Sequence, residues 1–97
     1  MKVIYKFKNH KKQPYTVGTQ KKIVYQGVDC YGLCDAPSKK EGLIKLKESL
    51  KGYDMAQVVL HELVHAYFYE ESEKTVEKFV RTYLRLLDVM KIKIVES

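Results

Sequence analysis

The sequence predicts an α+β domain in which a small antiparallel or mixed β-sheet packs on a helical hairpin. Residues 1–47 contain short runs of β-branched and aromatic residues, separated by glycine, proline and polar clusters, as in strands and turns. Residues 55–90 instead repeat apolar residues at intervals of three and four, as in amphipathic helices. The 97 residues suffice for one hydrophobic core, so we expect a single domain over residues 1–97.

The first half of the chain predicts three to five short strands. Lys2–Lys8 alternates between Val3, Tyr5 and Phe7 on one side and mostly lysine on the other, which predicts a strand with one buried face. A polar turn ending at Pro14 follows. The remaining expected strands are Tyr15–Thr19, Lys22–Gln26, Gly42–Lys47 and, within an irregular segment, a short one near Cys30–Asp35.

The second half predicts two helices joined by a turn of about three residues. Asp54 is the expected N-cap of the first helix, which covers Met55–Tyr69. Ser72 is the expected N-cap of the second, whose apolar spacing continues through Met90. The tail Lys91–Ser97 is either a strand or the frayed end of this helix.

The composition narrows the class of protein. No apolar run approaches the ~18 residues that span a bilayer, and no leader-like apolar stretch is present, so we expect a cytoplasmic protein without membrane contact. The net charge is +6, from 18 Lys and Arg against 12 Asp and Glu. Because arginine occurs only at Arg81 and Arg85, we expect a solvated lysine surface rather than a nucleic-acid partner.

One motif on the first expected helix carries chemistry. His61-Glu62-Leu63-Val64-His65 has the H-E-x-x-H pattern. Side chains four residues apart on a helix share one face, so both imidazoles can bind the same metal ion. Glu62 lies about 100° around the helix from His61, where it can act as a base on water without being a ligand. This combination predicts one Zn²⁺ per chain in a zincin-like metallopeptidase site.

A third protein ligand is expected from the start of the second helix. Glu73 and Glu77 are four residues apart and share a face. Either residue could bind the metal, and similarity to one gluzincin arrangement, E-x-x-x-D, implies Glu73 as the ligand and Glu77 as the hydrogen-bond partner of a histidine ligand, with the reverse assignment open. Glu70 and Glu71 in the turn are better explained as ordinary charged surface residues.

These residues make the chain similar to a known family. Val59–Ala66 resembles the core of gluzincin-type zincins, and Ser72–Phe79 resembles their third-ligand helix. The layout resembles the very small zincins called minigluzincins, and the short ImmA/IrrE-like metallopeptidases of phages and their hosts. Cys30–Asp35 and Gly42–Lys47 resemble the glycine turn and edge strand that precede the active-site helix. No glycine stands between the two histidines, so Met-turn metzincins are not implied.

The resemblance implies a zinc metalloendopeptidase that acts on a peptide or protein substrate. Glu62 would activate the water that zinc holds, and would then protonate the leaving amine. The substrate would lie extended along an edge strand made of Gly42, Leu43, Ile44, Lys45 and Leu46. The family includes latent forms, and the apolar tail Ile92–Val95 could inhibit this chain by adding a strand beside the same residues. The oligomeric state and the cleavage specificity do not follow from the sequence.

Two alternatives stay open at this point. Cys30 and Cys34 could join His61 and His65 in a structural zinc site of a non-catalytic domain, which would bind protein or nucleic acid through its basic surface. That site leaves Glu62 without a role, and packing of a loop explains the two cysteines better. The sequence also offers several tyrosines near the motif as oxyanion-stabilising phenols and singles out none of them: Tyr31, Tyr53, Tyr67 and Tyr69.

Overall fold

The structure is a computed structural model, which describes residues 1–37 and 40–94. It is an α+β fold with a four-stranded mixed sheet, a separate two-stranded ribbon and two helices. The strands are β1 (Lys2–Lys8), β2 (Pro14–Gln20), β3 (Ile23–Tyr25), β4 (Val28–Cys30), β5 (Gly32–Cys34) and β6 (Gly42–Lys47), and the helices are α1 (Gly52–Tyr67) and α2 (Glu73–Val89).

The order of strands in the main sheet is β1-β2-β6-β5. β2 and β6 are parallel, whereas β1 pairs with β2 and β5 pairs with β6 in antiparallel fashion. β6 therefore has a neighbour on each side, and the expectation that Gly42–Leu46 forms an open edge is wrong. The edge on that side of the sheet is β5, a strand of only three residues that the sequence indicated weakly.

The core lies between the sheet and α1. Gly42, Ile44 and Leu46 alternate towards the buried side of β6, and Tyr15, Ile44, Leu46 and Ala66 form one cluster. β1 lies at the opposite edge from β5, and of its residues only Phe7 is even half-buried. The predicted buried face therefore holds only at Phe7, which packs against this cluster, whereas Val3 and Tyr5 are more than half exposed.

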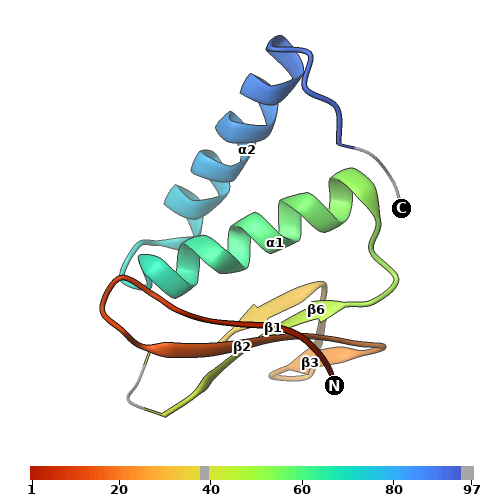
Figure 1. Cartoon of the computed structure of the whole chain (residues 1–97). Helices are drawn as coiled ribbons and strands as arrows, with labels where there is room; N and C mark the ends of the chain where they lie inside the picture. The colour runs from red at the N-terminus through yellow and green to blue at the C-terminus, as the bar shows by residue number, and fades with distance from the viewer. Residues whose placement is uncertain (38–39, 95–97) are drawn as a thin grey trace.

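α2 packs on α1 rather than on the sheet. Val76, Val80 and Leu84 are buried against Leu60 and Val64 of α1, on the side away from the strands (Figure 1). The expected sheet-on-hairpin packing is thus corrected to a stack in which α1 is the middle layer. The two helices meet at the turn between them and diverge towards the other end of α1.

The C-terminal tail returns towards this diverging end. Ile94 packs against the Val76–Val80–Leu84 cluster, and residues 91–94 form neither helix nor strand. In Figure 1 the tail descends beside the N-terminal end of α1, at the end opposite the turn into α2. Strand addition beside Gly42–Lys47 is contradicted, because β2 and β5 occupy both sides of β6. Val95, the last residue of the expected inhibitory segment, lies outside the described residues.

One of the two predicted helix N-caps agrees with the structure and the other does not. Ser72 caps α2 as expected, since its Oγ accepts a hydrogen bond from the Thr75 amide at 3.2 Å. Asp54 is not the cap of α1, because the helix begins two residues earlier, at Gly52. Gly52 has a φ of 53°, a conformation that glycine tolerates best, and this lets the chain turn into the helix after Lys51. Asp54 instead lies in the first turn.

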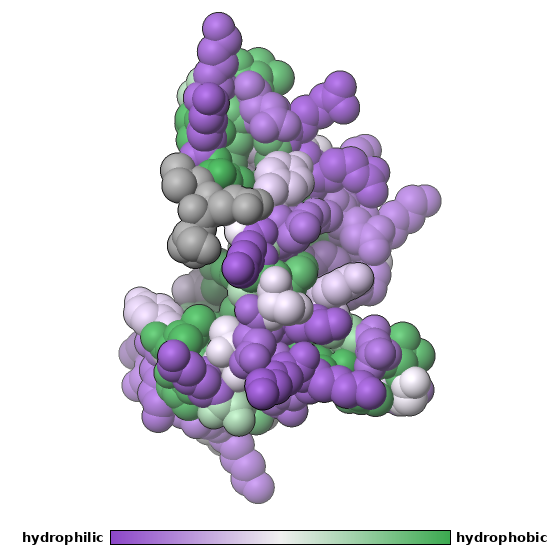
Figure 2. Space-filling view, turned by 90° about the vertical axis from the view of Figure 1, so that its right-hand side faces the viewer, coloured by the Kyte–Doolittle hydropathy of each residue, from purple (hydrophilic) through white to green (hydrophobic). Residues whose placement is uncertain are grey.

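The surface agrees with the charge pattern of the sequence. Hydrophilic side chains cover most of the face in Figure 2, and an apolar group gathers near its top. Leu86, Val89 and Met90, at the C-terminal end of α2, are all more than half exposed. No helix in the described part of the chain has the length and apolar character needed to cross a membrane.

Candidate metal centre

The two motif histidines lie side by side on α1. His61 Nε2 is 3.2 Å from His65 Nε2, and the two ring centroids are 4.9 Å apart. Their side chains are only 21% and 11% exposed. Residues four apart on a helix point in nearly the same direction, so regular helix geometry is enough to bring these nitrogens together.

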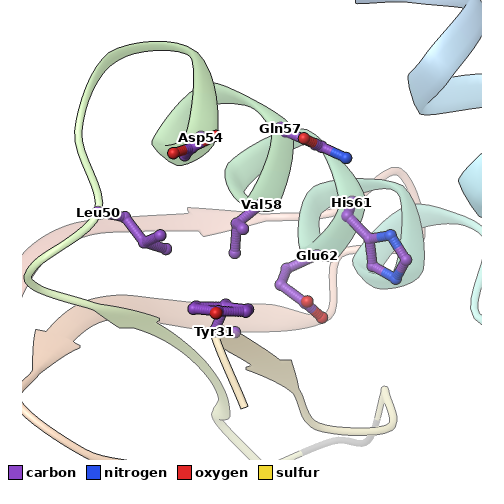
Figure 3. A pocket seen from close by; sticks show the side chains of 8 residues that line it. Tyr31, Leu50, Asp54, Gln57, Val58, His61 and Glu62 are labelled. Atoms are coloured by element: carbon purple, nitrogen blue, oxygen red, sulfur yellow. The ribbon is translucent and has the colours of Figure 1, made fainter. Parts of the chain in front are cut away.

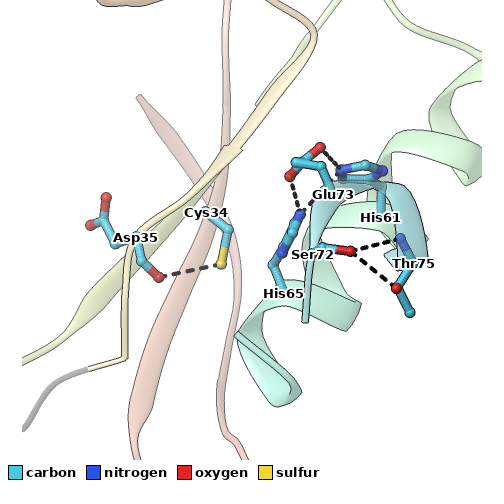
Figure 4. Close-up of polar contacts among 7 residues, drawn as sticks. All are labelled: Cys34, Asp35, His61, His65, Ser72, Glu73 and Thr75. Atoms are coloured by element: carbon cyan, nitrogen blue, oxygen red, sulfur yellow. Dashed lines mark hydrogen bonds and ion pairs between the residues drawn. The ribbon is translucent and has the colours of Figure 1, made fainter. Parts of the chain in front are cut away.

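Glu73 completes a three-residue cluster (Figure 4). Its Oε2 lies 3.2 Å from His61 Nε2, and its Oε1 lies 2.5 Å from His65 Nε2. Glu73 is the first residue of α2, and the Ser72 cap fixes where that helix starts. Because the connection between the helices is short, this first turn falls beside the His65 end of α1.

The donor set fits a divalent metal ion. One ligand atom from each of the three residues lies within 4.8 Å of the others. Ligand atoms at ~2.0–2.1 Å from one tetrahedral ion are about 3.3 Å apart, close to the two 3.2 Å separations here. Hydrogen bonds alone do not satisfy the cluster: if both Nε2 atoms donate to an ionised Glu73, neither keeps a lone pair for their mutual contact. A shared cation would account for the two 3.2 Å separations, whereas His65 Nε2 and Glu73 Oε1 lie closer than two ligand atoms of one ion would.

Glu77 does not join this cluster. It lies one turn further along α2, its side chain is exposed, and within the described residues no hydrogen bond or ion pair connects it to either histidine. Of the two candidate third ligands, Glu73 lies beside the histidines and Glu77 does not, and the expected contact of Glu77 with a histidine is absent among the described residues. The divergence of α2 from α1 explains this, because each further turn of α2 moves away from the histidines.

Glu62 occupies a different position from the ligands. It is 7% exposed, and among the described residues it makes no hydrogen bond or ion pair. Burial and, secondarily, the charge of Glu73 raise the pKa of its carboxyl from 4.5 to about 7. A nearly buried carboxyl without a protein partner carries a free-energy cost. Glu62 is therefore suited to chemistry at the site rather than to stabilising the fold.

Gly32 on β5 is a site residue that sequence reasoning did not single out. A Cβ at this position would lie 2.6 Å from Val58 Cγ1 and 3.0 Å from Glu62 Oε2. The absence of a side chain lets α1 approach the edge strand closely and leaves room for the Glu62 carboxylate. The only sequence signal was the glycine itself, in the middle of a short β-prone segment.

A cleft runs past Gly32, His61 and Glu62. On one side of these residues it holds about 490 Å³ and is lined by the first turns of α1; on the other it holds about 800 Å³ and extends to His65 and Glu73. β5 forms one wall of both parts. Tyr31 and Tyr69 line opposite ends of the cleft, whereas Tyr67 stacks on Phe7 at 5.9 Å and belongs to the core.

The cysteines lie near the metal cluster without joining it. Both are free thiols in the larger part of the cleft, and the Cys34 thiol donates to the Asp35 carbonyl oxygen at 3.4 Å (Figure 4). Burial and, secondarily, the charge of Glu62 raise the pKa of the Cys34 thiol to about 12. Among the described residues, the ligand atoms that come together are those of His61, His65 and Glu73, and neither thiol is part of that group.

Asn9 is a second residue whose importance the sequence did not reveal. Its buried side chain donates to the Ala66 carbonyl oxygen at 2.9 Å and accepts from the amides of Lys11 and Gln13. It thereby ties the β1–β2 turn to the helix residue that follows His65. The sequence indicated only a polar turn, since a contact between residues 57 positions apart has no local pattern.

Comparison of the chain with protein-family models, with curated proteins and with solved structures finds no match.

Proposed function

We propose that the chain is a zinc-dependent metallopeptidase of the minimal, gluzincin-like type. The observation that carries the proposal is the combination of the His61–His65–Glu73 cluster with a buried, unpaired Glu62 in the same cleft. Three protein ligands leave a fourth position open, as in catalytic rather than structural zinc sites. Bound zinc would polarise a peptide carbonyl and lower the pKa of water at that open position.

The chain's own residues supply the proton transfers. Glu62 accepts a proton from the attacking water and then donates it to the nitrogen of the leaving amine. A carboxyl beside the open position can take a proton from water and release it to the amine, as a general base and then a general acid do. Its buried position beside Gly32 limits competing water.

β5 provides a backbone surface for an extended peptide. Tyr31, Leu33 and Asp35 direct hydrogen bonds towards β6, so the amide and carbonyl groups of Gly32 and Cys34 point to the open edge. A peptide added at this edge would pass directly beneath Glu62. The role expected for Gly42–Leu46 thus moves to Gly32–Cys34.

Metal content tests the ligand set. The wild-type chain should hold one zinc ion. His65→Ala and Glu73→Ala should lose it, while Glu77→Ala, the matched control on the same helix, should keep it. A Cys30→Ser/Cys34→Ser double variant should also keep zinc. Loss of zinc from the double variant, with retention in Glu73→Ala, would instead support the structural cysteine–histidine site and its non-catalytic function.

A cleavage screen tests the reaction. The zinc-loaded chain is incubated with a mixed library of unstructured peptides, and new amino termini are detected by mass spectrometry. Products that appear with wild type and not with zinc-loaded Glu62→Gln support the proposal. Full zinc occupancy with no Glu62-dependent cleavage would contradict it.

A further inference from the structure

The smaller part of the cleft has the composition of a side-chain pocket. It holds about 490 Å³ next to His61 and Glu62, and its remaining lining is Tyr31, Gly32, Leu50, Asp54, Gln57 and Val58. Figure 3 shows the Tyr31 ring below, Leu50 and Val58 on the apolar side, and Asp54 on the first turn of α1. The pocket is thus apolar near its middle and acidic at the end away from the metal cluster.

The spacing of Asp54, Val58 and Glu62 suits a long side chain. These residues are four apart and share one face of α1, so Asp54 lies two turns, about 12 Å along the axis, from Glu62. A short substrate side chain next to Glu62 would not reach Asp54. Lysine and arginine have methylene stems that can lie along Leu50, Val58 and the Tyr31 ring, with a charged end that can reach the carboxylate.

Asp54 is available for such a contact. It is exposed, and no ion pair among the described residues engages it. An acid in a first turn also interacts favourably with the helix dipole, which explains its presence without a ligand. The buried Glu62 carboxylate also has no protein partner and points into the same pocket.

The charge of the cleft differs in sign from that of the chain. Five acids line its two parts: Asp35, Asp54, Glu62, Glu71 and Glu73. Within the described residues, none of the lysines or arginines lines either part, although the chain as a whole carries +6. Even with a divalent ion bound, the cleft keeps a net negative charge, and a concave site concentrates that field.

One basic side chain, Lys47, contacts Tyr31 in the wall of the pocket. Its Nζ lies 5.3 Å from the centroid of the Tyr31 ring, and its side chain does not line the pocket. A cation at this distance from a tyrosine ring is in the range of a cation–π contact. Lys47 also opposes a second positive charge nearby, so its removal should strengthen binding of a basic side chain.

We propose that this pocket is a specificity subsite for a lysine or arginine side chain next to the cleaved bond, with Asp54 as the selecting residue. The proposal rests on the peptidase function proposed above and names its substrate class. A glutamate side chain would be repelled by Asp54, and a purely apolar one would leave its carboxylate uncontacted.

The test uses peptide pairs that differ in charge alone. The zinc-loaded chain is assayed with fluorogenic peptides carrying arginine, or its neutral isostere citrulline, on either side of the cleaved bond. On one side we expect kcat/KM to favour arginine by about twofold to fivefold, as for an exposed ion pair. Asp54→Asn should bring this ratio close to one, and Lys47→Gln should raise it. Glu48→Gln, which removes an exposed acid outside the cleft, should leave it unchanged.

The outcomes separate this proposal from the peptidase proposal. If no peptide is cleaved, binding of the same arginine and citrulline peptides to the zinc-loaded chain is measured by fluorescence anisotropy. An arginine preference that depends on Asp54 then supports the subsite while the peptidase proposal fails. A ratio near one in wild type, or one that Asp54→Asn leaves unchanged, overturns the subsite in either assay. Equal melting temperatures of the variants exclude unfolding as the cause.

Discussion

α1 and α2 have nearly the same length, but they bury side chains of different chemical character. α1 buries Glu62, His65 and Ala66, whereas α2 buries Val76, Val80 and Leu84. α1 lies in the middle of the fold, where an apolar face would be the most stabilising choice, yet two of its three buried side chains are polar. The contrast teaches that α2 contributes mainly packing, while α1 gives up some stability by burying polar side chains.

The largest expected effect that distinguishes the two helices is a loss of catalytic turnover on substitution of Glu62 in α1. Glu62→Gln keeps the shape of the side chain and removes its ability to accept a proton. We expect turnover to fall by about 10²–10⁴-fold, the usual contribution of a general base. Zinc content should stay at the wild-type level, because Glu62 is not among the three ligand residues. A variant with zinc and near-normal turnover would show that α1 supplies no essential base.

The packing role of α2 predicts a large effect on stability. Leu84 is 2% exposed in the cluster between the helices, so Leu84→Ala should lower the free energy of unfolding by about 2–5 kcal/mol. Leu86→Ala is the matched control, because Leu86 is 53% exposed on the same helix and should change stability by less than about 0.5 kcal/mol. Urea unfolding followed by circular dichroism measures both. Equal losses would contradict the division of roles.

The buried carboxylate of α1 predicts a pH dependence of the metal-free protein. Folding raises the pKa of Glu62 from 4.5 to about 7, so the folded state binds a proton more tightly than the unfolded state. The stability that this group contributes is complete below pH ~4.5 and falls as the pH rises to ~7. Wild type should therefore lose up to about 3 kcal/mol relative to Glu62→Gln across this window. Unfolding curves of both chains in chelator at pH 4.5 and pH 8 give the difference, and a pH-independent gap would count against the burial of Glu62.

The smallest of these effects concerns the start of α2. Ser72→Ala removes the hydrogen bond to the Thr75 amide and should cost about 1 kcal/mol. Because the cap also positions Glu73, zinc affinity should weaken modestly. Ser49→Ala, at an exposed position in a turn, serves as the control and should change neither quantity. Unchanged zinc affinity in Ser72→Ala would show that Glu73 is positioned by the helix packing alone.

Local sequence signals predicted the helices and strands better than they predicted what each of these elements packs against. The bounds of β6 and the Ser72 cap agree with the sequence, because alternation and capping depend on residues a few positions apart. The burial of Val3 and Tyr5 in β1, the start of α1 and the edge position of Gly42–Lys47 did not agree. Each of these depends on which distant segment lies alongside, such as the parallel pairing of β2 with β6.

The sequence by itself determined the α+β class, the helix that carries His61, Glu62 and His65, and the common face of the two histidines. These follow from periodicities that the backbone imposes within one element. Only the tertiary structure showed that Glu73, and not Glu77, lies beside the histidines, because the angle between the helices sets which turn of α2 comes near them. It alone also revealed Gly32 and the open edge of β5, since the order of strands in a sheet and the approach of a helix to it arise from contacts between remote segments.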